Sequence, residues 1–233
     1  YDINYFQYED LKIKYSDHGN GKTFLFIHGL GSSSFTWRYL YEYYSKDYRV
    51  ISLDLKGFGD SSKPINSHYM ISDQAKIINL FIKQNNLKNV TLIGNSYGGA
   101  VVLSTYINAN VEIKRVITKM ILLDPAVYYQ NKLPGYVTLL RTPIINRLVL
   151  SLGSKNFIAN IVLNQIFYNT SLVTDKMVTT YGGYLKGLNS HNALIETAKH
   201  VSSFETEILS NSYNKIDIPV LIIWGENDML LMS

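Results

Sequence analysis

The sequence predicts an α/β protein with a mostly parallel sheet and helices on both of its faces. Short, continuously apolar runs recur along the chain, and such runs form strands that are buried on both faces. Segments with helical periodicity separate these runs, which is the pattern of parallel βαβ units. Residues 126–200 break the alternation, because amphipathic helical patterns follow one another there. We expect this interval to be a helical insertion between two strands.

Three apolar segments mark the first half of the predicted sheet. Residues 11–16 alternate between apolar and polar side chains, which is the period of a half-buried strand. Residues 24–27 form a continuous apolar run, and residues 48–53 predict another strand, which is ended by Asp54. The aromatic segment between them, residues 35–44, predicts a short helix.

The second half repeats the alternation. Ser72 and Asp73 offer N-cap side chains for a helix whose apolar positions continue to Ile82. Further strands are predicted over residues 90–93, 120–123 and 220–224, and helices over 98–108, 143–152 (started by Thr142) and 155–168. We therefore predict a core of residues 1–125 and 201–233 and a helical cap, or lid, of residues 126–200.

Composition excludes several classes of protein. The chain has 233 residues, of which 46% are hydrophobic and 17% charged, so it is not a disordered chain. It has no cysteine, which excludes disulfides, zinc–thiolate sites and a thiol nucleophile. The net charge of +4 is scattered, so no nucleic-acid partner is expected. No apolar run approaches the roughly 18 residues that cross a bilayer. We expect neither a cofactor nor a bound metal.

Residues 94–99 read Gly-Asn-Ser-Tyr-Gly-Gly and lie between a predicted buried strand and a predicted helix. The pattern G-x-S-x-G in that setting is typical of a nucleophile elbow. Its glycines permit a sharp turn that lifts the Ser96 hydroxyl off the sheet, and the following helix N-terminus places a positive dipole end beside it. Ser96 is the candidate nucleophile; a plain strand-to-helix turn is the alternative.

Three further signatures follow predicted strands in a fixed order: residues 28–31 (His-Gly-Leu-Gly), 54–61 (Asp-Leu-Lys-Gly-Phe-Gly-Asp-Ser) and 224–228 (Trp-Gly-Glu-Asn-Asp). With the elbow, they make the whole chain resemble the α/β-hydrolase superfamily, in its serine-nucleophile branch. The resemblance implies an oxyanion hole formed by the backbone N–H groups of Leu30 and Tyr97. It also implies that His28 is structural rather than the catalytic base.

The same resemblance implies an acid and a base for Ser96. Asp228 matches the acid that ends the Trp-Gly-x-x-Asp pattern, while Asp124 is the alternative acid or a turn residue beside Pro125. The family order is serine, acid, histidine. None of the five histidines (His18, His28, His68, His191, His200) follows a late strand. We therefore expect the final strand, helix and histidine loop to lie beyond Ser233; a degenerate, non-catalytic relative is the other interpretation.

A serine at the elbow favours acyl chemistry over the branches that need a carboxylate there, the haloalkane dehalogenases and epoxide hydrolases. We predict a carboxylesterase-like serine hydrolase of small apolar or aromatic acyl substrates, with the 233-residue chain itself inactive without the histidine. Because Asn95 precedes the nucleophile, a C–C bond hydrolase of diketone-type substrates is an alternative, as is an inactive ligand-binding relative. The predicted lid offers many aromatic side chains to a substrate or to its own packing: Tyr128, Tyr129, Tyr136, Phe157, Phe167, Tyr168, Tyr181 and Tyr184. Candidate hinges are Pro134, Gly135, Gly182 and Gly183.

A dinucleotide-binding protein is an alternative hypothesis from a different functional class. Residues 29–34 follow a strand with two glycines, and Asp54 stands where a ribose-binding acid could lie, but Ser34 replaces the third glycine. The chain begins with Tyr1 rather than Met, so a preceding signal or anchor stays open. The compartment and the oligomeric state are therefore open, with the cytoplasm favoured.

Overall fold

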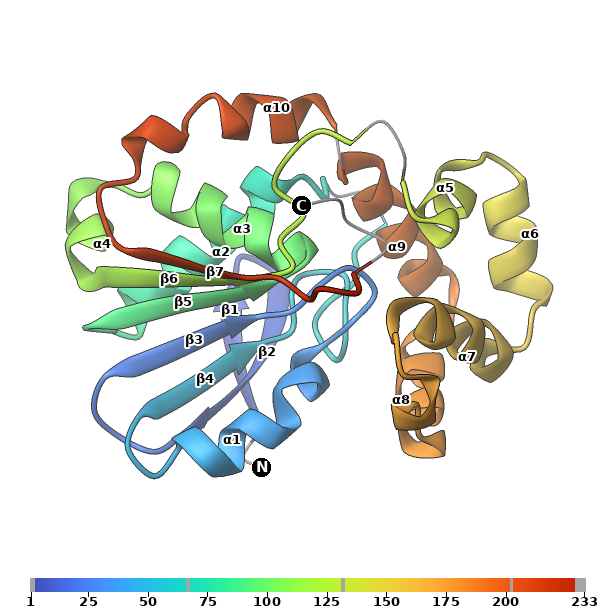
Figure 1. Ribbon diagram of the computed structural model, residues 1–233, viewed down its shortest axis with the longest axis horizontal. Coiled ribbons are helices and arrows are strands. Elements are labelled where there is room, and N and C mark those ends of the chain that lie inside the picture. Colours follow the sequence, from blue (N-terminus) through green and yellow to red (C-terminus); the bar gives the residue numbers. More distant parts are fainter. Residues whose placement is uncertain (1–2, 66–67, 131–132, 202, 229–233) are drawn as a thin grey trace.

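The computed structural model describes residues 3–65, 68–130, 133–201 and 203–228. Its centre is a seven-stranded sheet in the order β1-β2-β4-β3-β5-β6-β7 (Figure 1). β1 and β2 run antiparallel to their neighbours, whereas the other five strands, β4, β3, β5, β6 and β7, are mutually parallel. The strands are β1 (Asn4–Tyr8), β2 (Leu11–His18), β3 (Thr23–Ile27), β4 (Arg49–Leu53), β5 (Val90–Asn95), β6 (Ile117–Leu123) and β7 (Val220–Ile223). The predicted mostly parallel sheet is confirmed.

Helices cover both faces of this sheet. The core helices are α1 (Arg38–Tyr44), which follows a 3₁₀ turn (Ser34–Trp37), and α2 (Ile71–Gln84), α3 (Tyr97–Ile107), α4 (Val111–Val116) and α10 (Phe204–Ser210). On β3, Leu25 and Ile27 pack into the large apolar cluster with α2 and α3, whereas Phe26 packs with Trp37 and Tyr41 on the opposite face. The alternation along one strand thus explains why both of its faces are buried.

The first turn of α2 differs from its prediction. The helix begins at Ile71, and Asp73 accepts a hydrogen bond from the Met70 N–H at 3.0 Å, so Ser72 is not the cap. Instead, the Glu205 carboxylate on α10 accepts from the N–H groups of Ile71 and Ser72 at 2.9 and 2.8 Å. A carboxylate is stabilised at a helix N-terminus, so Glu205 ties α10 to α2.

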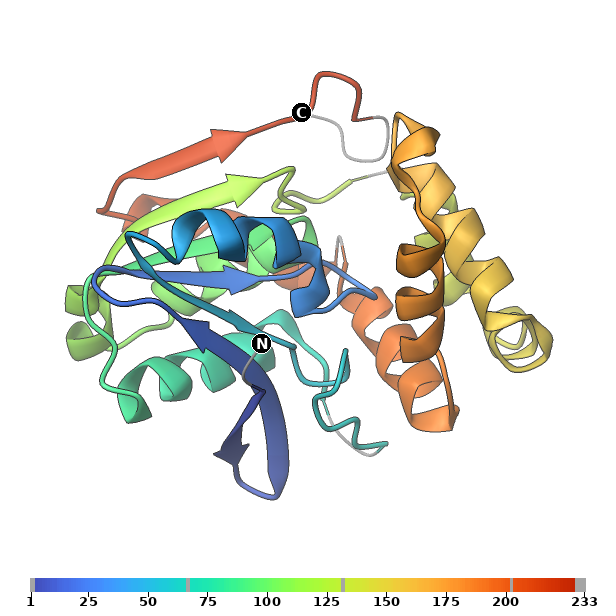
Figure 2. The ribbon, with the colours of Figure 1, turned by 90° about the horizontal axis from the view of Figure 1, so that it is seen from below.

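The interval predicted as a cap forms a group of helices beyond the carboxyl ends of the parallel strands (Figure 1). Figure 2 shows the same separation from below. The helices are α5 (Gly135–Arg141), α6 (Ile145–Leu152), α7 (Lys155–Ile166), α8 (Asp175–Tyr184) and α9 (Leu188–His200). Of these, α6 and α7 were predicted, although α6 begins at Ile145 rather than beside Thr142. In the described ranges, no helix combines the length and apolar character that would be needed to cross a membrane.

The glycine pair proposed as a hinge lies inside α8. A Cβ at Gly182 would come within 2.3 Å of the Asn156 Oδ1, so this glycine lets α7 and α8 approach closely. Gly183 has open space around it and continues the helix. Pro134 and Gly135 instead mark the start of α5. The close helix contact therefore explains Gly182 better than hinge motion does.

Candidate active site

Ser96 occupies a strained turn between β5 and α3. Its backbone has φ 54° and ψ −122°, a conformation that costs a non-glycine residue about 1–3 kcal/mol. Hydrogen bonds hold the turn: the Ser96 N–H donates to Leu123 O at 3.0 Å, and Ser96 O accepts from the N–H groups of Gly99 and Ala126. The surrounding sheet and helix thus fix the elbow that the sequence pattern predicts.

Two glycines of the elbow are required by close backbone packing. A Cβ at Gly94 would lie 2.5 Å from Gly98 O, and one at Gly98 would lie 2.4 Å from Ile27 O. Real Cβ atoms do not approach backbone oxygens so closely, so either substitution would move α3 away from β3 or β5. The pattern G-x-S-x-G therefore has a steric cause here.

The loop after β3 packs directly against the elbow. A Cβ at Gly29 would come within 3.2 Å of the Ser96 Cβ, which places the next residue, Leu30, beside the serine. Leu30 and Ser96 line the same cavity, while the Tyr97 side chain is buried in the core. Within the described ranges, the backbone N–H groups of Leu30 and Tyr97 donate to no protein carbonyl. Both groups are therefore available to an oxygen bound beside Ser96.

His28 and Asp54 serve the framework of these loops. The buried His28 ring accepts a hydrogen bond from the Leu55 N–H at 2.9 Å, and its Nδ1 lies 2.8 Å from Gly29 O. Burial lowers the pKa of His28, against the opposing effect of the Asp54 charge. The Asp54 carboxylate is fully buried and accepts from the N–H groups of Ser34 and Asp60 at 2.6 and 2.9 Å. It is thus occupied within the protein, which removes the ribose-binding acid of the dinucleotide reading.

Both candidate acids line the cavity that contains Ser96. Asp124 directly follows β6 with φ 42°, and its Oδ1 accepts a hydrogen bond from the Gly225 N–H at 2.7 Å. The Asp228 N–H donates to Gly225 O at 3.0 Å. Asp124 thus supports the loop that carries Asp228. Burial, and secondly the negative charge of Asp228, raise the pKa of Tyr136 to about 12, so this phenol stays protonated at neutral pH.

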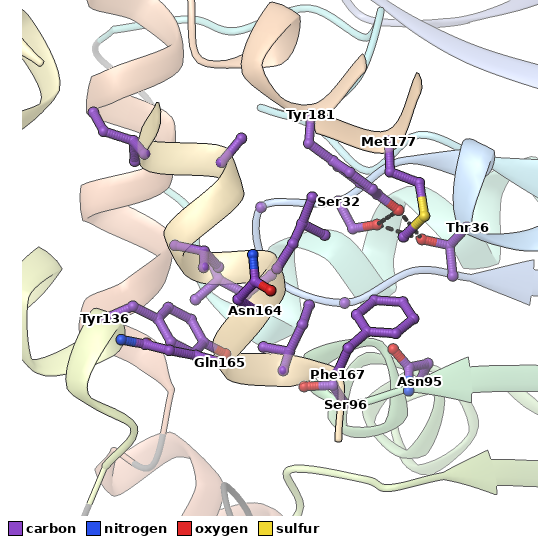
Figure 3. A pocket seen from close by; sticks show the side chains of 18 of the residues that line it. Ser32, Thr36, Asn95, Ser96, Tyr136, Asn164, Gln165, Phe167, Met177 and Tyr181 are labelled. Atoms are coloured by element: carbon purple, nitrogen blue, oxygen red, sulfur yellow. Dashed lines mark hydrogen bonds between the residues drawn. The ribbon is translucent and has the colours of Figure 1, made fainter. Parts of the chain in front are cut away.

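The cavity has a volume of about 940 Å³ and lies between the sheet and the helices α5 to α9. Figure 3 shows Ser96 and Asn95 at its sheet end, and Met177 and Tyr181 on α8. Its walls are largely apolar: Leu139, Leu140, Val149, Leu150, Ile158, Ala159, Val162, Leu163, Ile166, Phe167, Leu185 and Leu194 contribute to them. Four of the eight predicted lid aromatics line it, namely Tyr136, Phe167, Tyr168 and Tyr181. Tyr128, Tyr129 and Phe157 are instead exposed.

A small polar cluster in this cavity was not predicted. The Tyr181 hydroxyl lies 2.9 Å from Thr36 Oγ1, which is 2.5 Å from Ser32 Oγ (Figure 3). The Tyr181 ring also contacts Phe35 edge-on, with the ring centroids 5.8 Å apart. These contacts join α8 to the loop after β3. The polar side chains at residues 32–36 are the only sequence signal for the cluster, since nothing in the sequence pairs them with Tyr181.

No histidine lines the cavity in the part of the chain that the structure describes. His191 lies on α9 with its Nε2 2.8 Å from Leu185 O, and His200 ends the same helix, 3.7 Å from the Glu205 carboxylate. The structure therefore brings Ser96, Asp228 and Leu30 to one cavity, and Tyr97 directly follows Ser96. The described ranges supply no histidine beside them.

The chain is similar to known hydrolases along most of its length. An uncharacterized hydrolase, YugF, of Bacillus subtilis is 25% identical over 98% of this chain and 82% of its own length. A 2-hydroxy-6-oxo-6-(2'-aminophenyl)hexa-2,4-dienoic acid hydrolase of Metapseudomonas resinovorans is 24% identical over 95% of this chain and 73% of its own.

Solved structures share the fold. An α/β-hydrolase fold protein from Burkholderia ambifaria superposes with a TM-score of 0.84 at 20% identity, over 98% of this chain and 82% of its own. Other structures with TM-scores of 0.80 or above include an esterase, an epoxide hydrolase and a haloalkane dehalogenase. The family model for the alpha/beta hydrolase fold matches residues 22–231. The chain therefore belongs to the α/β-hydrolase fold family.

Proposed function

We propose that this hydrolase is a serine hydrolase in which Ser96 attacks the carbonyl carbon of an ester-type bond. The observation that carries the proposal is the strained Ser96 turn, which opens on a large apolar cavity together with Asp228 and the Leu30 loop. In the proposed reaction, Ser96 Oγ bonds to the carbonyl carbon and its proton passes to a base. The protonated base gives this proton to the departing alcohol, which leaves an acyl-enzyme. The same base then takes a proton from water, the resulting hydroxide attacks the acyl carbon, and the proton returns to Ser96 Oγ as the acid is released.

The proposed oxyanion hole consists of the Leu30 and Tyr97 backbone N–H groups. Both donors are unused in the described ranges, and the Tyr97 N–H belongs to the first residue of α3. Removing one donor of such a hole costs roughly 3–4 kcal/mol of transition-state stabilisation. In this proposal Asp228 orients the base, which the family resemblance implies to be a histidine, and Asp124 positions the loop of Asp228.

The cavity favours an apolar or aromatic acyl group. Aliphatic side chains from α5 to α9 line one side of it, and burial of an apolar group against them contributes about 25 cal/mol per Å². A volume of about 940 Å³ is at the upper end of small-molecule sites, which span roughly 300–1,000 Å³. The proposed substrate is therefore a sizeable apolar ester.

Carbon–carbon bond hydrolysis is the second candidate. One relative is named as a 2-hydroxy-6-oxo-6-(2'-aminophenyl)hexa-2,4-dienoic acid hydrolase. In this chain Asn95 directly precedes Ser96, which is the feature that suggests carbon–carbon bond hydrolysis. The Asn95 Nδ2 donates to Leu123 O at 3.2 Å, so its amide is engaged in holding the elbow. This bond gives Asn95 a structural role that serves either reaction, so Asn95 does not favour carbon–carbon bond hydrolysis over ester hydrolysis.

A fluorophosphonate probe tests the nucleophile. The protein expressed from its whole reading frame is treated with the probe, digested and analysed by mass spectrometry. The expected product carries the probe mass on the Ser96 peptide; Ser96→Ala abolishes labelling, and Ser32→Ala, a second serine in the cavity, retains it. Labelling that persists in Ser96→Ala would overturn the assignment. The 233-residue chain alone is expected to turn over aryl esters little, because no histidine of the described ranges lines the cavity.

A further inference from the structure

The outer side of α6 and the start of α7 carry large apolar side chains that do not line the cavity. We name this group the α6 ridge: Ile144, Ile145, Leu148, Leu152 and Phe157. Their exposed fractions are 73%, 48%, 53%, 81% and 64%, and none of them contributes to the cavity wall. α6 lies at the end of the molecule farthest from α4 (Figures 1 and 2). A patch of exposed apolar side chains marks an interaction surface.

Helical geometry explains how α6 has two apolar sides. Ile145, Leu148 and Leu152 recur at intervals of three and four residues and therefore share one side of the helix. Asn146 and Leu150, on another side, are buried against the neighbouring helices. Packing within the protein thus uses one side only, and the ridge is left to a partner outside the chain.

Positive charge is concentrated in the same region. Residues 133–188 contain five basic residues, Arg141, Arg147, Lys155, Lys176 and Lys186, and one acidic residue, Asp175. This segment has a net charge of +4, equal to that of the whole chain, because the remaining residues contain 17 basic and 17 acidic side chains. The helical region is therefore basic, whereas the rest of the chain is neutral.

Three of these cations are interleaved with the ridge along the chain. Arg141 precedes Ile144, Arg147 lies on α6 itself, and Lys155 stands between Leu152 and Phe157. The Arg141 guanidinium donates to Val201 O, and the Lys155 ammonium donates to Leu150 O at the end of α6. In the described ranges, the Arg147 guanidinium has no hydrogen bond or ion pair and is exposed. An apolar helix side with basic neighbours is the composition of helices that lie in a membrane interface.

We propose that the α6 ridge docks on an anionic lipid surface. Apolar side chains enter the headgroup boundary, while basic residues near the surface are attracted to anionic lipid. A second copy of the chain fits less well, because a two-fold interface through the ridge would bring two basic faces together. The proposal goes beyond the ester hydrolysis proposed above and needs no turnover. If the docking and the ester hydrolysis both occur, the lipid surface lies against helices whose inner residues, such as Val149 and Ile158, line the cavity.

Vesicle flotation tests the docking. The protein is mixed with vesicles of phosphatidylcholine alone, or of phosphatidylcholine and phosphatidylglycerol, and the bound fraction is measured after centrifugation. Binding is expected for the anionic vesicles and should decrease with added salt. Leu152→Glu should lower the partition coefficient at least about tenfold, since it replaces an inserting apolar group by a charge that anionic lipid repels. The matched control is Val111→Glu at the far end of the molecule, where Val111 on α4 is 65% exposed; it should leave binding unchanged.

The other outcomes overturn the proposal. Equal binding to neutral and anionic vesicles would show that the basic residues do not contribute to docking. An equal effect of Leu152→Glu and Val111→Glu would show that the α6 ridge is not the docking surface. Light scattering completes the test: a dimer that Leu152→Glu converts to a monomer, with no vesicle binding, would assign the ridge to a second copy. Ser96→Ala should bind vesicles like the wild type, so failure of docking and failure of the proposed catalysis remain distinguishable.

Discussion

The strand that carries the candidate nucleophile and the strand that carries the candidate acid differ sharply in burial. β5 is buried along its length up to Gly94, with Leu92 fully inaccessible. All four residues of β7 are exposed, and Leu221 and Ile222 are 53% and 57% accessible. Both strands end at the same edge of the sheet, since both pair in parallel with β6.

This difference indicates two ways of holding a candidate catalytic group. Ser96 is held by packing, because glycine contacts and backbone hydrogen bonds of β3, β6 and α3 enclose its turn. Asp228 is held by a short series of polar contacts, from Asp124 to Gly225 and from Gly225 to Asp228. We therefore expect substitutions beside Ser96 to affect the stability of the whole fold, and substitutions beside Asp228 to act locally.

The largest expected difference is between Leu92→Ala and Leu221→Ala. Leu92→Ala leaves a cavity in the core and should lower the free energy of unfolding of this chain by about 3 kcal/mol. Leu221→Ala at the exposed strand should change it by less than about 0.5 kcal/mol. Urea titrations followed by circular dichroism measure both. Similar losses in the two variants would show that β7 is buried in solution.

The second comparison uses one glycine from each loop. In Gly98→Ala, the new methyl would lie 2.4 Å from Ile27 O, and relief of this overlap should cost about 2 kcal/mol of unfolding free energy. In Gly225→Ala, the nearest atom is the Asp124 Oδ1 at 3.6 Å, so the change should stay within about 0.5 kcal/mol. Thermal melts of the two variants, made in parallel, compare their stabilities. A Gly98→Ala protein as stable as Gly225→Ala would contradict the close packing of the Ser96 turn against β3.

A smaller and local effect is expected for Asp124→Ala. It removes the acceptor of the Gly225 N–H and places alanine at φ 42°, so opening of residues 224–228 should become easier by about 1 kcal/mol. Amide hydrogen exchange at Gly225 should then be about fivefold faster. Asp124→Asn is the control, because its amide oxygen can accept the same bond and asparagine tolerates this backbone conformation. Equal exchange in all three proteins would show that Asp124 does not hold the loop.

The features that the sequence predicted are those set by local pattern. The buried strands β3 to β6 and the elbow at Ser96 follow from apolar runs and from glycines with steric roles, both visible over a few residues. The Glu205 contact with α2 joins residues 134 positions apart, and no local pattern specifies it. The edge strand β1 was missed as well, because its stability comes from antiparallel pairing with β2.

The candidate site divides in the same way. Ser96, Leu30 and Asp228 were named from motifs, and the structure places all three around one cavity. The cluster of Tyr181 with Thr36 depends on the packing of α8, and the support of Gly225 by Asp124 depends on the pairing of β6 with β7. Such contacts arise from tertiary structure, so a sequence motif can name a candidate catalytic residue but not the residues that hold it in place.

The smallest predicted effect is the pH dependence of stability that arises from His28, the buried histidine of the loop that packs against the Ser96 turn. Burial lowers the pKa of His28 from its ordinary value of 6.5, and the positive charge of Lys14 acts in the same direction, while Asp54 and the bond to Gly29 O oppose it. The unfolded chain therefore binds a proton near pH 6.5 that the folded chain does not accept. The contribution of His28 to the free energy of unfolding is complete above this pH and decreases as the pH falls below it. Between pH 7 and 6 the decrease is less than about 1 kcal/mol.

His28→Asn separates this contribution from others. Asparagine does not titrate, so the unfolding free energy of the variant, although lower at pH 7, should depend less on pH between 7 and 5 than that of the wild type. His191 also has a pKa lowered by burial, and His191→Asn measures its share of the slope. Urea titrations at several pH values give both slopes. If His28→Asn leaves the slope unchanged, the buried ring takes up its proton in the folded state, and the loops after β3 and β4 are less rigid than the elbow they support.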